Sequence, residues 1–165
     1  MHWKQGRGGD ILRLNPMECD ATGVRLPVQG AGQGNYGVFE RLFQKLIYQF
    51  DPERRITLLR SSDDPELERY FDVMRSPGST HMELDGRIYV KIHDKQNPSK
   101  GVWLEEFAHA LQFIKYGNVP LSSDDRQRRE RELEVAQCLK ERAGRLHLLD
   151  EDMRHLEQAI EYYGQ

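Results

Sequence analysis

Residues 103–112 read WLEEFAHALQ, and this stretch decides the predicted fold. Its apolar residues recur with the period of a helix and form one broad side, while Glu105, Glu106, His109 and Gln112 gather on the other. Glu105 and His109 are one helical turn apart and therefore lie on one line. A metal-binding helix needs two ligands one turn apart with a carboxylate beside them. The same residues would also suit the polar side of any amphipathic helix.

The chain around this helix predicts an α+β fold with a small, mainly antiparallel sheet. Asp85-Gly86 separates two β-prone runs and predicts a hairpin, because this dipeptide supplies the positive φ angles of a type I′ turn. The predicted elements are a helix capped by Asn35 and ending near 50, a strand at 55–59, a helix at 65–74, the hairpin strands at 80–84 and 87–94, and helices at 102–116, 124–147 and 150–163. The hairpin is expected to pack against the helix at 102–116 and the C-terminal helices. Residues 1–35 are glycine-rich and predicted to form a separate N-terminal segment, with a single domain at 36–165.

The composition narrows the class of protein. With 38% hydrophobic and 31% charged residues among 165, the chain is predicted to be soluble and globular. No apolar run approaches the roughly 20 residues that span a bilayer, and the first residues lack a secretory signal, so no membrane association is expected. A net charge of −3 does not favour nucleic acid as a partner. Cys19 and Cys138 are predicted to be free thiols.

The following helix supplies a third candidate ligand. Its apolar stripe consists of Val135, Ala136, Leu139, Ala143 and Leu146. Glu132 falls in the centre of this stripe, where a carboxylate is costly unless a metal or another cation pairs with it. Glu134 falls on the opposite side. Glu132 is therefore the preferred third ligand, and Glu134 is the fallback.

The order of hairpin, E-x-x-H helix, turn and helix with a core-facing glutamate resembles the zincin metallopeptidases, and within them the gluzincin type. The resemblance covers roughly residues 80–143. It implies a zinc-dependent metallohydrolase acting on a peptide or protein, with Glu106 as general base. It also implies Zn²⁺ ligands at Glu105, His109 and Glu132, and a substrate peptide added alongside residues 87–93.

One position departs from the family pattern, because Glu105 stands where the family has its first histidine. Two anionic ligands would make the metal a weaker Lewis acid. The alternative hypothesis is a catalytically inactive zincin-like module that binds a protein partner. The E-E-x-x-H-A-x-Q motif also resembles metallopeptidase-like domains at the C-terminal ends of bacterial polymorphic toxins. The glycine-rich start without a targeting signal would suit a fragment of a longer secreted bacterial protein.

Two further constellations are weaker. Glu132-Leu133-Glu134 matches the E-x-E of ADP-ribosyltransferases, with Arg60 and Ser79-Thr80 as companions, but a charged helix is the wrong context for that motif.

The pair Glu106-x-x-His109 and Asp152-x-x-His155 is similar to the paired motif of di-iron carboxylate bundles, which need four long helices. Asp152 and His155 fit the first turns of a terminal helix more simply. His93 is predicted to be a surface histidine.

Overall fold

The computed structural model describes residues 36–118 and 125–165. Within these ranges the elements are α2 (Tyr36–Phe50), β1 (Ile56–Arg60), α3 (Pro65–Met74), β2 (Gly78–Met82), β3 (Ile88–Ile92), a 3₁₀ turn η1 (Asp94–Gln96), α4 (Lys100–Tyr116), α5 (Asp125–Glu141), α6 (Ala143–Leu146) and α7 (Asp150–Tyr163). The predicted α+β class with a small sheet is confirmed. The glycine-rich segment at 1–35, with Cys19 and Asn35, lies outside the described residues.

The three-stranded sheet has the order β1-β3-β2, so β3 is its central strand. β2 and β3 form the predicted antiparallel hairpin, with Thr80 opposite Val90, and β1 lies parallel to β3. The sheet is therefore mixed, with one ladder of each kind. The predicted type I′ turn is wrong: in the loop between β2 and β3 only Gly86 has a positive φ, at 88°, and it ends a turn closed by the hydrogen bond from Gly86 N to Glu83 O. A bulge-type loop needs one left-handed residue, and glycine supplies it without strain.

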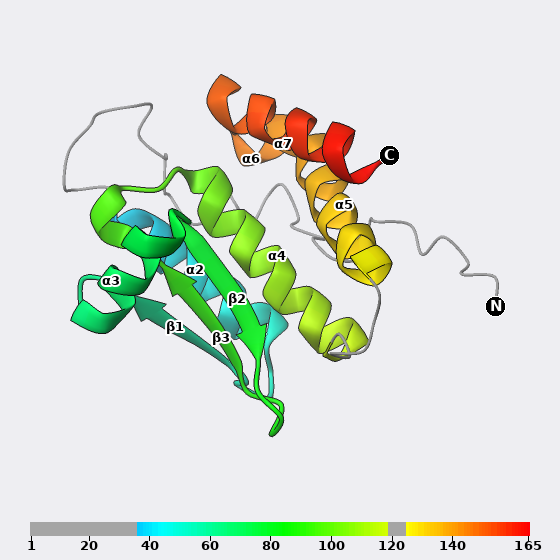
Figure 1. Ribbon diagram of the computed structural model, residues 1–165. Coiled ribbons are helices and arrows are strands. Elements are labelled where there is room, and N and C mark those ends of the chain that lie inside the picture. Colours follow the sequence, from blue (N-terminus) through cyan, green and yellow to red (C-terminus); the bar gives the residue numbers. More distant parts are fainter. Residues whose placement is uncertain (1–35, 119–124) are drawn as a thin grey trace.

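Helix α4 is the centre of the molecule, as Figure 1 shows, because it contacts the sheet, α2, α5 and α7. Ser99 caps it by accepting a hydrogen bond from Val102 N. Its predicted apolar side is buried: Trp103, Phe107 and Ala110 are at most 3% exposed. Their partners in the core are Phe43 and Leu46 of α2, Ile88, Val90 and Ile92 of β3, and Val135, Ala136 and Leu139 of α5. Burial on all these sides fixes how far α4 can rotate or slide.

The C-terminal helices pack on the other side of α4 from the sheet (Figure 1). The single helix predicted at 124–147 is divided at Arg142, between α5 and α6. Helix α7 is joined to the start of α4 by Asp152, whose carboxylate accepts hydrogen bonds from Ser99 Oγ at 2.5 Å and from Leu149 N at 3.3 Å. Gly101 permits this contact, since a Cβ there would overlap the Asp152 carboxylate. Among the described residues, none of the helices is both long and apolar enough to span a bilayer.

His93 is not a surface residue as predicted, because it is only 3% exposed. Its Nδ1 lies 2.9 Å from Ser61 Oγ and its Nε2 lies 2.9 Å from Asp72 Oδ1, while the Phe71 ring stacks on it. Ser61 Oγ also donates to Asp94. These contacts tie the end of β1 to the end of β3, so His93 belongs to the framework of the sheet.

Candidate metal centre

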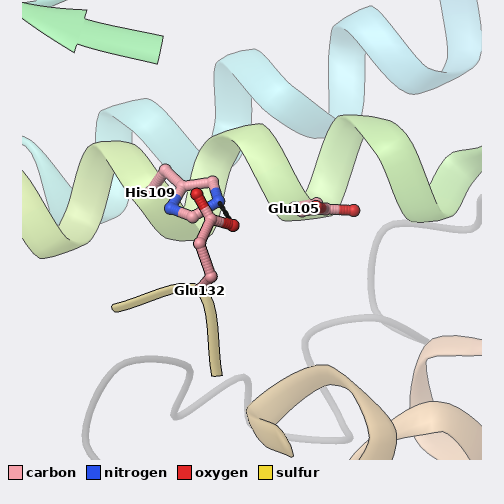
Figure 2. Close-up of side chains that lie close together, drawn as sticks. All are labelled: Glu105, His109 and Glu132. Carbon is pink, nitrogen blue, oxygen red and sulfur yellow. Dashed lines mark ion pairs between the residues drawn. The ribbon is translucent and has the colours of Figure 1, made fainter. Parts of the chain in front are cut away.

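Three of the predicted residues converge on one point between α4 and α5. Glu105 and His109 come from successive turns of α4, and Glu132 comes from α5 (Figure 2). One potential ligand atom from each lies within 4.8 Å of the others. His109 Nε2 is 3.2 Å from Glu132 Oε2, and their side chains are 15% and 38% exposed. Chain segments more than 20 residues apart therefore bring an imidazole and two carboxylates together.

Gln112 orients His109, a role that the sequence pattern did not reveal. Its side-chain nitrogen donates to Arg131 O at 2.9 Å and to Glu134 Oε2 at 2.7 Å, which leaves Oε1 to accept from His109 Nδ1 at 3.0 Å. A histidine that donates from Nδ1 presents its other nitrogen, Nε2, as the ligand atom. Gln112 was predicted on the polar side of the helix, but it is 1% exposed because α5 covers it.

The fallback ligand Glu134 has a different place. Its carboxylate accepts from Gln112 and, at 2.7 Å, from Tyr116 Oη. It therefore joins the C-terminal turns of α4 to α5 and is not among the three clustered ligand residues. Glu134 does not lie on the side of α5 away from α4, as the stripe predicted, because it contacts two α4 residues; Glu132 is the glutamate of the two that reaches the cluster. Glu132 is partly exposed, and His109 supplies the cationic partner that its position requires.

The charge of the cluster keeps His109 protonated in the absence of metal. Burial lowers the pKa of His109, but the hydrogen bond to Glu132 and the negative charges of Glu132, Glu106 and Glu105 outweigh it and raise the pKa to about 9. In the metal-free protein the positive charge at this point is therefore the proton on His109, which a metal bound at that atom would have to displace.

Glu106 lies between α4 and the edge of the sheet, where a general base would be expected. Thr80 Oγ1 donates to Glu106 Oε2 at 2.5 Å. A Cβ at Gly78 would lie 2.8 Å from Glu106 Cγ, so the glycine leaves room for this side chain. Burial, reinforced by Glu105 and Glu132, raises the pKa of Glu106 to about 7 against the lowering effects of His109 and Thr80. A carboxyl group with a pKa near 7 accepts and returns protons efficiently at neutral pH.

Glu105 has a second partner that the sequence did not identify. Its Oε2 lies 3.4 Å from Nε2 of His155, on α7, and this contact raises the pKa of His155. His155 was predicted only as part of the first turns of the terminal helix. The contact arises because Asp152 docks α7 on the start of α4, which the sequence separates by about 50 residues.

The cluster opens into a pocket of about 630 Å³ between β2, α4 and α5. Its wall includes Gly78–Met82, the whole of β2, which pairs only with β3 and so has a free edge among the described strands. Glu105 and Glu106 also line a second pocket of about 360 Å³ that continues past Gly78 towards His155. The expected peptide track along 87–93 is wrong, because β3 is paired on both sides. The strand beside the site is β2.

The donor set fits a metal ion. Imidazole and carboxylate oxygens are ligands that Zn²⁺ accepts, and three protein ligands leave an open position for a substrate or water. Comparison with protein-family models, with curated proteins and with solved structures gave no match to this chain. The chemistry of this centre is therefore inferred from its own residues.

The residues considered for ADP-ribosyl transfer are not assembled in this pocket. Arg60 forms ion pairs with Glu40 and Asp63, both at 2.6 Å, and is not among the residues that line the pocket. Thr80 lines it but donates to Glu106. The E-x-E residues point to different partners, since only Glu132 contacts His109.

Proposed function

We propose that this protein is a zinc-dependent metallohydrolase that cleaves peptides. The observation that supports this most strongly is the convergence of Glu105, His109 and Glu132 within 4.8 Å beside Glu106, a carboxylate whose pKa is about 7. Glu105, His109 and Glu132 would hold the metal. When bound, Zn²⁺ supplies Lewis acidity, which acidifies water and polarises a carbonyl group.

Glu106 acts as general base and then as general acid. Thr80 occupies its Oε2, so Oε1 is the atom that accepts a proton from water as the water oxygen attacks the carbonyl carbon. The same proton passes to the amide nitrogen as the carbon–nitrogen bond breaks, which yields a carboxylic acid and an amine. Burial between α4 and β2 keeps the carboxyl group in one position and sets its pKa for both transfers.

The free edge of β2 would hold the peptide. His93 N donates to Pro77 O, and Glu83 N donates to Arg87 O, so the odd-numbered residues of β2 face β3. Antiparallel bonding alternates, and the backbone groups of Gly78 and Thr80 therefore face the pocket. An extended peptide bonded to them would pass Glu106.

Metal content is the first test. We expect about one zinc per chain by mass spectrometry in protein purified without chelator or affinity tag. Glu105→Ala, His109→Ala and Glu132→Ala should each reduce it, while Glu134→Ala should retain it because Glu134 binds Gln112 and Tyr116. A protein that takes up no metal even with added zinc would contradict the proposal. Equal loss in Glu134→Ala would contradict the ligand assignment.

Catalysis is tested separately with Glu106→Gln. This variant should bind zinc and peptide but lose roughly a hundredfold or more in cleavage rate, the scale of general acid–base catalysis. Unchanged cleavage would remove Glu106 from its role.

One observation favours a second function, a zincin-like module that binds a protein partner without cleaving it. The proposed ligand residues already have partners within the protein, since His109 pairs with Glu132 and Glu105 pairs with His155. Such a module would use the same β2 edge. Peptide binding with no metal and no cleavage is the result that would distinguish it from the hydrolase.

A further inference from the structure

Arg131 lines the pocket, and its guanidinium forms no ion pair with the described residues; Glu134, a carboxylate whose charge acts on it, already accepts hydrogen bonds from Gln112 and Tyr116. The guanidinium carbon lies 5.7 Å from the centre of the Phe113 ring and 5.5 Å from that of Tyr116. Two aromatic faces hold the cation by the attraction of their quadrupoles, and its hydrogen-bond donors have no acceptor among the residues that the structure describes.

The acidic residues of the same pocket differ from Arg131, because each has a partner. Glu132 pairs with His109, Glu105 with His155, and Glu106 accepts from Thr80. The pocket residue that offers an unpaired charge among the described residues is therefore a cation, at the end formed by α5 and the last turns of α4. Arg128 lines the same end and is exposed, which adds a second positive charge there.

The position of Arg131 is fixed through its own backbone. Arg131 O accepts a hydrogen bond from the buried amide of Gln112, and Glu134, one turn on, is held by Gln112 and Tyr116. The α4–α5 register that brings Glu132 to His109 therefore also sets the guanidinium beside Phe113. Burial lowers the pKa of Arg131, yet an arginine side chain keeps its charge in proteins.

We infer that Arg131 binds a carboxylate of the substrate, so that the peptide taken by this site carries an acidic side chain or a free C-terminus about two residues from the cleaved bond. This inference rests on the proposed peptidase function. Guanidinium and carboxylate form paired hydrogen bonds, and the stacked side chain has little freedom left to lose on binding. Phe113 follows His109 by one turn, a rise of about 6 Å, so the carboxylate lies about two residues from the bond along an extended peptide.

Peptide binding to zinc-loaded Glu106→Gln protein tests this without cleavage. The probes are a neutral peptide blocked at both ends, versions with one glutamate moved along the sequence, and the neutral peptide with a free C-terminus, all measured by fluorescence anisotropy. At one glutamate position, or with the free C-terminus, we expect binding about tenfold tighter than for the matching glutamine or amide peptide, as for a charged hydrogen bond. The glutamate scan separates a side-chain carboxylate from a terminal one.

Three added substitutions identify the residue responsible. Arg131→Met keeps an unbranched chain across the rings and should abolish the preference without weakening binding of the neutral peptide. Arg131→Lys keeps the charge but not the paired donors and should retain part of the preference. Arg128→Ala should leave most of it. Circular dichroism checks that each variant is folded. If Arg131→Met loses the preference for acidic peptides while Arg131→Lys keeps part of it, the loss does not come from misfolding.

The contrary results are distinct. Equal binding of acidic and neutral peptides, or a preference that survives Arg131→Met, overturns the role of Arg131 and leaves the peptidase proposal standing if the wild-type protein cleaves them. If no peptide is bound by Glu106→Gln or cleaved by the wild-type protein, the peptidase proposal fails and this inference fails with it.

Discussion

The pKa of His109 makes the stability of the metal-free protein fall as the pH rises. The folded state raises this pKa from the ordinary 6.5 to about 9, so the folded protein holds a proton that the unfolded chain releases earlier. Stability from the His109–Glu132 pair is therefore complete below pH 6.5 and is lost as the pH rises through about 9. A rise of that size corresponds to about 3 kcal/mol. Because Glu132 is 38% exposed and water screens the pair, we expect a loss of about 2 kcal/mol.

Urea unfolding in the presence of a chelator, followed by far-ultraviolet circular dichroism from about pH 6 to about pH 10, measures this loss. Glu132→Gln keeps the shape of the side chain without its charge and should flatten the dependence. Glu130→Gln removes a charge from an exposed residue of the same helix, one that pairs with Arg126, and should leave the dependence unchanged. Glu106 contributes in a lower window, since its raised pKa removes stability between 4.5 and about 7.

Nuclear magnetic resonance titration of the imidazole gives an independent reading. The reasoning is refuted if His109 titrates at or below 6.5, or if wild-type protein and Glu132→Gln lose stability equally over this range. Saturating zinc should remove the dependence above neutral pH, because the metal takes the place of the proton.

Three further predictions concern single side chains. Gly78→Ala places a Cβ 2.8 Å from Glu106 Cγ and should lower the rate of peptide cleavage by about tenfold or more, with zinc content unchanged. The control is Gly144→Ala, whose added Cβ would meet no atom within 4 Å, and this variant should cleave at the wild-type rate. Gln112→Leu leaves the buried donor and acceptors around it unsatisfied and should lower the unfolding free energy in urea by about 1–3 kcal/mol. Burial raises the pKa of Asp94, but hydrogen bonds from two serines outweigh this effect and hold the pKa below 3.8. The free energy of unfolding should therefore fall as the pH falls below that value. Asp94→Asn should weaken this dependence on pH, and an unchanged dependence in the variant would contradict the assignment.

The sequence predicted the helices well because their apolar periodicity reports burial directly. The same periodicity selected Glu132 as the candidate ligand, but it placed Glu134 on the opposite side of α5, whereas both glutamates contact α4. The spacing of Glu105 and His109 also follows from helical geometry alone.

Contacts between distant segments were outside the reach of periodicity. Because β1 pairs with β3, β3 is the central strand and has no free edge for a peptide. The strand with a free edge beside the site is β2, and the sequence did not indicate this. Gln112 looked polar and exposed because its partners, Arg131 O and Glu134, belong to another helix. His155 reaches Glu105 only through the docking of α7, which no local pattern indicates.

The bond between Ser99 and Asp152 has a consequence for how the molecule opens. It joins the residue that caps α4 to the first turn of α7, and Lys100 Nζ, one residue later, donates to Leu146 O. Separation of α7 would therefore remove the acceptor that holds the α4 cap residue and release the partner of Glu105 in the same event. The first turn of α4 and the first turn of α7 should exchange their amide hydrogens as one cooperative unit, with a common opening free energy, although about 50 residues of chain lie between them.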